Sequence, residues 1–387
     1  MEQNYSNTRG FLSDTDLSEN LITRARRKRA GKYIDLTSSN PTHHQLLFPA
    51  DVLRTAAEVY WQERRYEPDP KGIFAAREAI AAYYMRREPA FSVSPDDVVV
   101  TASTSEAYNL LFALLTEPGD NVLAPDITYP LFEHLALLHH VELRSYRLVE
   151  EAGWQIDETS LLRAADARTR AILLVSPHNP TGVAISKPIA ALEQLDLPVI
   201  CDEVFADFPY RLPYIPPLGS LHPHLCIFHL NGISKMLALP DLKLSWIAMT
   251  ARAASHFRAR LEILNDIFLS ASSLIQSMLP VLLENGREFQ AAMRQRIRSS
   301  LDLGLKIIAT CPRLHAHSPD GGYYLFVRVS DCDDEEELVL HLLDRGVFVH
   351  PGYFFNCEHG AHIAISTLIE PETLETGLCR VVDALAV

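Results

Sequence analysis

Three side chains with complementary chemistry follow one another through the middle of the chain. Asn179 opens the stretch Asn-Pro-Thr-Gly (179–182), Asp202 opens Asp-Glu-Val-Phe (202–205), and Lys235 lies in a Ser-Lys pair. An amine can form a Schiff base with an aldehyde, a carboxylate can hold a proton on a ring nitrogen, and an amide can bond a ring oxygen. These residue types therefore suit a pyridine aldehyde whose ring withdraws electrons.

Each of these side chains comes just after an apolar run that is typical of a buried strand. The runs cover residues 171–175, 198–201 and 225–229, and helical patterns alternate with such runs. This alternation predicts an α/β fold with a mostly parallel sheet flanked by helices. Because such sheets bind ligands at the carboxyl ends of their strands, we expect the three side chains to converge on one crevice.

The last third of the chain has a different pattern. Long helical stretches alternate there with strand-like runs, which predicts a smaller α+β domain. The helices are expected at about 288–309 and 335–345, and the strands at 322–329, 347–350 and 362–366.

The motifs at 179–182, 202–205 and 231–243 resemble those of fold-type I pyridoxal-phosphate (PLP) enzymes, specifically the class I and II aminotransferases. The resemblance runs from about Asp35 to the C-terminus. It implies that PLP is the cofactor, that Lys235 carries it as a Schiff base, and that an amino group passes from a small-molecule donor to a keto acceptor through a pyridoxamine intermediate. It also implies a division into a large PLP-binding domain and a small domain, at 46–285 for the first and 1–45 with 286–387 for the second.

The turn at Ser103, Thr104 and Ser105 is a candidate anion site. It follows a predicted strand and opens a helix, where hydroxyls and free backbone N–H groups can bind a phosphate. The resemblance implies that this turn holds the cofactor phosphate, although an ordinary helix cap is the alternative. Lys243 stands where the family usually has an arginine, and it would add a point charge to the phosphate.

Two tyrosines match further positions of the family. Tyr129 matches the aromatic residue that stacks on the cofactor ring, with a core aromatic as the alternative. Tyr66 matches a tyrosine that reaches the phosphate of the neighbouring subunit's cofactor. The resemblance therefore implies a homodimer with shared active sites.

The chain departs from the family most clearly at Ala364. Here the family has an arginine that binds the substrate α-carboxylate, so either another cation substitutes or the substrate is atypical and lacks that group. His362 lies two residues away on the same face of the predicted strand, and His43 lies in the expected substrate loop. Both are candidate substrate ligands, with ordinary strand or loop polarity as the alternative.

Other activities on the same cofactor stay open. A PLP-dependent lyase, decarboxylase or cyclase would use the same residues, because the fold does not choose among them. A non-catalytic PLP-binding protein is a further alternative. A nucleotide-binding enzyme is not favoured, since the chain has neither G-x-x-x-x-G-K-[ST] nor a convincing G-x-G-x-x-G after a strand.

Composition narrows the class of partner. The 387 residues carry a formal net charge of −14, which argues against nucleic acid. There is no apolar run near the roughly 20 residues that a membrane span requires, so we expect no membrane insertion. The six cysteines form no C-x-x-C pair, so neither a metal site nor a disulfide framework is expected. A cytoplasmic location is the simplest expectation.

Overall fold

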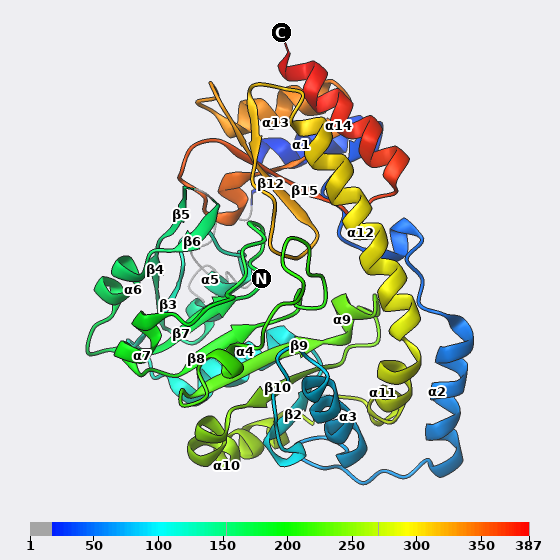
Figure 1. Ribbon diagram of the computed structural model, residues 1–387, viewed down its shortest axis with the longest axis vertical. Helices are drawn as coiled ribbons and strands as arrows, with labels where there is room; N and C mark the ends of the chain where they lie inside the picture. The colour runs from blue at the N-terminus through cyan, green and yellow to red at the C-terminus, as the bar shows by residue number, and fades with distance from the viewer. Residues whose placement is uncertain (1–17, 152, 270, 387) are drawn as a thin grey trace, which may run out of the picture.

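The computed structural model describes residues 18–151, 153–269 and 271–386 and is built around a seven-stranded sheet (Figure 1). The strand order is β2–β10–β9–β8–β7–β3–β4. In that order the strands are Val98–Thr101, Ser245–Met249, Ile227–Gly232, Val199–Asp202, Thr169–Val175, Asn121–Pro125 and Glu142–Tyr146. Neighbours from β9 to β4 run parallel, and β10 is antiparallel to both of its neighbours. The predicted mostly parallel sheet is confirmed.

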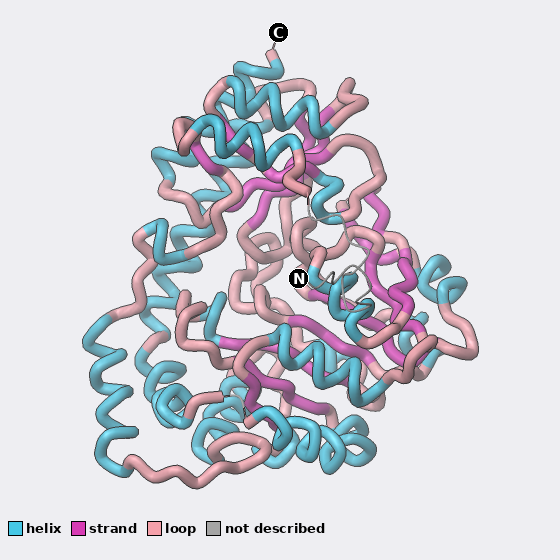
Figure 2. The backbone as a smooth tube through the Cα atoms, turned by 180° about the vertical axis from the view of Figure 1, so that it is seen from behind, coloured by secondary structure: helices cyan, strands magenta, loops and turns pink. Residues whose placement is uncertain are grey.

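Helices cover both faces of this sheet because its strands are apolar on both sides. Alternate residues of β2 point to opposite faces: Val98 and Val100 pack with α3 and α11, whereas Val99 packs with α4 and α10. These four helices are Phe74–Met85, Ser273–Asn285, Thr104–Leu115 and Ala251–Phe268, in the order just named. Figure 2 shows the same arrangement from behind, with helices around the strands.

Shorter elements complete this part of the molecule. A hairpin of β5 (Leu148–Glu150) and β6 (Trp154–Ile156) extends from the end of β4. The other helices of this part are α2 (Ala50–Glu63), α5 (Leu131–Leu138), α6 (Glu158–Ala164), α7 (Ala190–Leu195), α8 (Leu218–Leu221) and α9 (Ile233–Met236). No helix among the described residues is both long enough and apolar enough to cross a membrane.

A second sheet lies in the C-terminal third, as the pattern predicts. Its four antiparallel strands have the order β11–β12–β15–β14, with bounds Leu314–Ala316, Tyr324–Val329, His362–Ser366 and His350–Pro351. Its helices are α12 (Arg287–Ile308), α13 (Glu335–Asp344) and α14 (Pro371–Leu385). In Figure 1 the long α12 runs from the region of α11 up to α14, and so connects the two parts.

The N-terminal segment packs against this second part. Its helix α1 (Leu21–Arg29) contacts α13, and β1 (Ile34–Asp35) pairs in parallel with β13 (Val347–Phe348). The strand expected at 347–350 is therefore two strands, because the chain changes partners after Phe348: β13 pairs with β1, whereas β14 pairs with β15.

Candidate active site

A cavity of about 280 Å³ lies at the carboxyl ends of β7, β8 and β9. Six of the residues expected to bind the cofactor or react there line it, namely Thr104, Ser105, Tyr129, Asn179, Asp202 and Lys235. The convergence follows from the parallel order of the three strands, since Asn179, Asp202 and Lys235 each sit at or a few residues past a strand end. The opposite wall comes from the N-terminal segment and the second sheet.

The carboxyl group of Asp202 is fixed at the end of β8. Its Oδ2 accepts a hydrogen bond from the Tyr108 hydroxyl at 2.9 Å, and its Oδ1 accepts one from the backbone N–H of Val204 at 2.9 Å. Burial raises the pKa of Asp202 to about 6, against the lowering effects of those two bonds and of Lys235. The site therefore destabilises a lone carboxylate and favours a positively charged partner beside it.

We predict that Asp202→Asn stabilises the cofactor-free protein at pH 8 by up to about 3 kcal/mol. The folded-state pKa of about 6 exceeds the ordinary value of 3.8, and each pKa unit corresponds to roughly 1.4 kcal/mol. Because the pKa is raised, the destabilisation is absent below pH 3.8, develops as the pH rises, and is complete above pH 6. Urea unfolding of both proteins at pH 8 and at pH 4 measures this difference in stability. A variant that is less stable than wild type at pH 8 contradicts the prediction.

Asn179 has hydrogen-bonding capacity that the protein does not use. Its Oδ1 is buried without a hydrogen-bond partner among the described residues, and the side chain lines the cavity. Its neighbour His178 is fully engaged: burial lowers the pKa of His178 to about 4, so the ring is neutral. Nε2–H donates to the Ile127 carbonyl at 3.0 Å, and Nδ1 accepts from the Thr181 hydroxyl at 2.9 Å. The amide of Asn179 is thus the group left for a ligand.

Lys235 reaches the cavity from the short helix α9. The chain enters this helix at Gly232, where an added Cβ would lie 2.3 Å from Ser245 Oγ and 2.8 Å from the Leu244 carbonyl. The close approach of β10 therefore favours glycine at this position. Lys235 is half-buried and lies near enough to Asp202 to lower the pKa of that carboxyl.

The start of α4 combines a helix cap with cavity-lining hydroxyls. Ser103 is the cap: its Oγ accepts the backbone N–H of Glu106 at 3.1 Å, while the Glu106 carboxylate accepts the N–H of Ala102 at 2.6 Å. Thr104 and Ser105 line the cavity, and Ser103 does not. Ser103 thus takes the role of helix cap, the alternative that the sequence left open, and Thr104 and Ser105 stay candidates for binding a phosphate.

Three other predicted ligands lie outside the cavity. Lys243 is exposed, with a φ of 49°, and does not line it. Tyr66 is 75% exposed on a different part of the surface, beside Leu269. His43 is exposed on the short 3₁₀ helix Pro41–His44.

His362 is also not brought to the cavity, which removes it from the candidate substrate ligands. Its ring is fully buried and stacks on Phe326, with 4.6 Å between centroids. Its Nε2 lies 3.6 Å from Oε2 of Glu150, on β5. Burial alone would lower the pKa of His362, but contacts with Cys357 and Glu150 raise it to about 10. His362 therefore links the second sheet to the β5–β6 hairpin.

Several cavity residues were missed from the sequence. They include Thr37, Ser39, Tyr108, Phe132, His178, Tyr324, His350, Phe354 and Phe355. Tyr108 could have been found from its helical spacing to Thr104 and Ser105, since residues three and four apart share a helix face. His350 carried no local signal.

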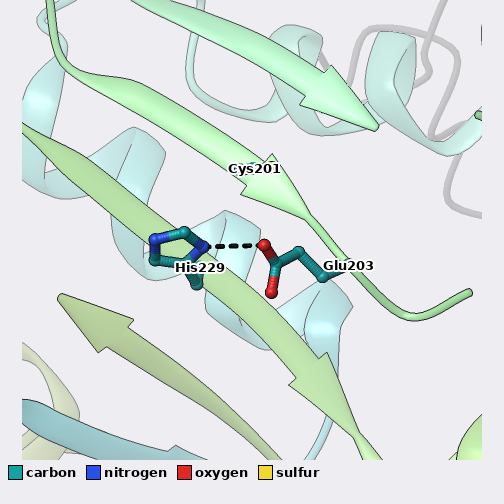
Figure 3. A group of neighbouring side chains, drawn as sticks. All are labelled: Cys201, Glu203 and His229. Carbon is teal, nitrogen blue, oxygen red and sulfur yellow. Dashed lines mark hydrogen bonds and ion pairs between the residues drawn. The ribbon is translucent and has the colours of Figure 1, made fainter. Parts of the chain in front are cut away.

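A buried group of Cys201, Glu203 and His229 resembles a set of metal ligands, but Glu203 and His229 already bond each other (Figure 3). Glu203 accepts from His229 Nδ1 at 2.9 Å and from Arg87 at 3.0 Å, and His229 Nε2 accepts the N–H of Gly219. Burial alone would raise the pKa of Glu203, but His229 and Arg87 lower it to about 2. The Arg87 guanidinium supplies the positive charge that a cation would bring.

The cavity residues fit PLP. Lys235 supplies an amine for the aldehyde, Asp202 a buried carboxylate for the ring nitrogen, and the side-chain NH₂ of Asn179 a donor for the ring oxygen. Thr104 and Ser105 place hydroxyls at the N-terminus of a 12-residue helix, where a phosphate is stabilised. The fold and this site define a PLP-dependent enzyme of fold type I.

Comparison with known proteins gives the family. The model of the aminotransferase class I and II family matches residues 31–381, so the chain belongs to that family, and the predicted class and cofactor are confirmed. Nicotianamine aminotransferase 1 of rice (Oryza sativa subsp. japonica) is 28% identical over 335 residues, which cover 81% of this chain and 66% of the relative. Tyrosine aminotransferase of Dictyostelium discoideum is 28% identical over 325 residues, which cover 79% of this chain and 78% of the relative. The structure of alanine aminotransferase from Pyrococcus furiosus superimposes with a TM-score of 0.86 at 26% identity, over 95% of both chains.

Proposed function

We propose that the protein is an aminotransferase that uses Lys235 as both the anchor of PLP and the acid–base group of the reaction. The observation that carries the proposal is the convergence of Lys235, Asp202 and Asn179 on one cavity. When bound, PLP supplies a Schiff-base link to the amine and an electron sink for the substrate carbon. Membership of the aminotransferase family favours transfer over the lyase, decarboxylase and cyclase alternatives.

Each of the cavity residues would then have a separate role in the reaction. Once released, Nζ of Lys235 would take the proton from the substrate Cα and hold it for delivery, as general base and then general acid. The carboxylate of Asp202, held by the Tyr108 hydroxyl, would keep a proton on the ring nitrogen of PLP. Asn179 donates to the ring oxygen, and Phe205 offers no second donor there because it lacks a hydroxyl. Tyr129 lies at the cavity as the aromatic ring that would stack on the cofactor.

An atypical substrate is part of the proposal. Ala364 stands where the family has the carboxylate-binding arginine, and it is buried between β12 and β14. Seven aromatic side chains line the cavity, namely Tyr108, Tyr129, Phe132, Phe205, Tyr324, Phe354 and Phe355. They favour an apolar or aromatic amino compound. Two relatives are a tyrosine and a nicotianamine aminotransferase, which supports a bulky substrate.

The test is to titrate the PLP-loaded protein with amino donors and identify the cofactor product. The panel contains aromatic and aliphatic α-amino acids and the matching amines without a carboxylate. Conversion of the bound cofactor to pyridoxamine phosphate supports transfer. Release of ammonia or carbon dioxide with regeneration of PLP would instead support a lyase or a decarboxylase. Stable PLP binding without turnover of any donor would support a non-catalytic binding protein.

A homodimer with shared sites belongs to the same proposal. Tyr66 is exposed beside the end of α10, where Ile263, Ile267 and Phe268 are each more than half exposed. A surface this apolar on one helix end suits burial against a second copy. Sedimentation of the holoenzyme tests the dimer, and Tyr66→Phe tests whether the hydroxyl contributes to PLP affinity. A monomer with full activity would exclude shared sites.

A further inference from the structure

The described residues of one protomer give the cavity no fixed cation to replace the missing arginine. Among the described residues that line it, Lys235 is the single lysine or arginine, and its amine is committed to the cofactor in the proposed function. From residue 18 onward, the N-terminal segment and the second sheet contribute hydroxyls, aromatic rings and one imidazole, which is that of His350. A substrate carboxylate bound against this wall would therefore lose its hydration without gaining an opposite charge.

His350 lies where its side chain could take over substrate binding from the arginine that is absent at Ala364. It pairs directly with Ala364 across β14 and β15. Side chains of directly opposed residues leave an antiparallel sheet on the same face, so the imidazole projects beside the position of the family's arginine. His350 lines the cavity, whereas the methyl group of Ala364 is buried.

The surroundings of His350 fix its ring and keep it neutral. The ring stacks on Phe354 with centroids 4.7 Å apart and planes 10° from parallel. Burial lowers the pKa of His350 to about 4; the two charged groups that act on it, Asp35 and Arg26, have opposite effects and pair with each other at 3.3 Å. A neutral imidazole offers one N–H donor and one acceptor. No hydrogen bond within the described part of the chain uses either ring nitrogen.

We propose that His350 determines substrate specificity by hydrogen bonding a neutral polar group of the amino substrate at the position where relatives bind a carboxylate. The substrate class is then an amine whose carboxyl group is absent or masked, as an amide for example, and whose remaining part is apolar enough for the aromatic wall. This rests on the proposed aminotransferase function, since it concerns the same cavity. A neutral hydrogen bond favours such a group because His350 would have to take up a proton, against its lowered pKa, before it could pair with a carboxylate.

The first experiment measures binding without turnover. Calorimetry on the PLP-loaded enzyme compares 3-phenylpropanamide with 3-phenylpropanoate at pH 7.5, two probes that lack an amine and differ at one terminal group. We expect wild type to bind the amide about 10-fold more tightly than the acid. Tighter binding of the acid, or no binding of the amide, overturns the proposal.

Variants at the same position assign that preference to His350. His350→Phe keeps the stacking on Phe354 but removes the donor, and it should lower amide affinity about 10-fold while leaving acid affinity nearly unchanged. His350→Asn, which keeps a donor, should restore part of the loss, and His350→Arg should reverse the preference towards the acid. An unchanged amide-to-acid ratio in His350→Phe overturns the proposal.

Turnover separates this inference from the proposed function. The rate of pyridoxamine phosphate formation is compared for L-phenylalaninamide and L-phenylalanine. If wild type transfers from the amide and His350→Phe lowers kcat/KM for the amide mainly through KM, both proposals stand. If wild type transfers the amino group but His350→Phe lowers kcat/KM equally for the two donors, the proposed role of His350 is rejected and the aminotransferase function stands. Absence of transfer from every donor rejects the aminotransferase function, while the calorimetric ratio still reports on His350.

Discussion

Lys235→Ala is expected to abolish covalent cofactor attachment and to lower the rate of amino transfer by about 10²–10⁴-fold or more. The variant removes both the amine that binds the aldehyde and the group that moves the substrate proton, and proton transfer by a positioned side chain contributes about that factor. Borohydride reduction followed by peptide mass analysis locates the adduct. Single-turnover kinetics with the best donor gives the rate.

The matched control is Lys187→Ala, which removes an exposed lysine outside the cavity. It should retain the adduct and the rate of wild type. An adduct that maps to Lys243 in the wild-type protein would contradict the assignment, because Lys243 lies eight residues further along and is exposed. Persistence of full activity in Lys235→Ala would exclude its role as general base.

Arg87→Met is expected to reduce the free energy of unfolding by about 3–5 kcal/mol, because it leaves a buried carboxylate without its counter-charge. The side chains of Arg87 and Glu203 are 8% and 1% exposed and lie 3.0 Å apart. Arg87 also donates to the Ile215 carbonyl at 2.9 Å, so the loss includes a second buried bond. Urea unfolding of the cofactor-free protein measures the change, which keeps cofactor binding out of the comparison.

Two comparisons make this result specific to the buried pair. Arg258→Met removes an exposed pair with Asp97 at 2.9 Å and should cost at most about 1 kcal/mol. Adding Glu203→Gln to Arg87→Met should recover part of the lost stability, because the unpaired charge is then gone. If the double variant loses the sum of the two single losses, the Arg87–Glu203 interaction is not the cause.

Local sequence determined which residues could hold the cofactor. Asn179, Asp202 and Lys235 each follow an apolar run, and strands in a parallel sheet bring their carboxyl ends to one edge. Their convergence therefore depends only on the order of strands and helices. The hydroxyls of Thr104 and Ser105 follow in the same way, since they stand at the start of a helix after β2.

Tertiary structure decided which side chains form the substrate wall. His362 and Ala364 share a strand face, but the sequence does not show that Phe326 covers His362 or that β14 places His350 opposite Ala364. In the same way the exposure of Lys243 depends on the backbone geometry around it. Cross-strand partners and covering rings come from distant parts of the chain. A local pattern fixes the face of a residue, whereas only the packed structure fixes what that face meets.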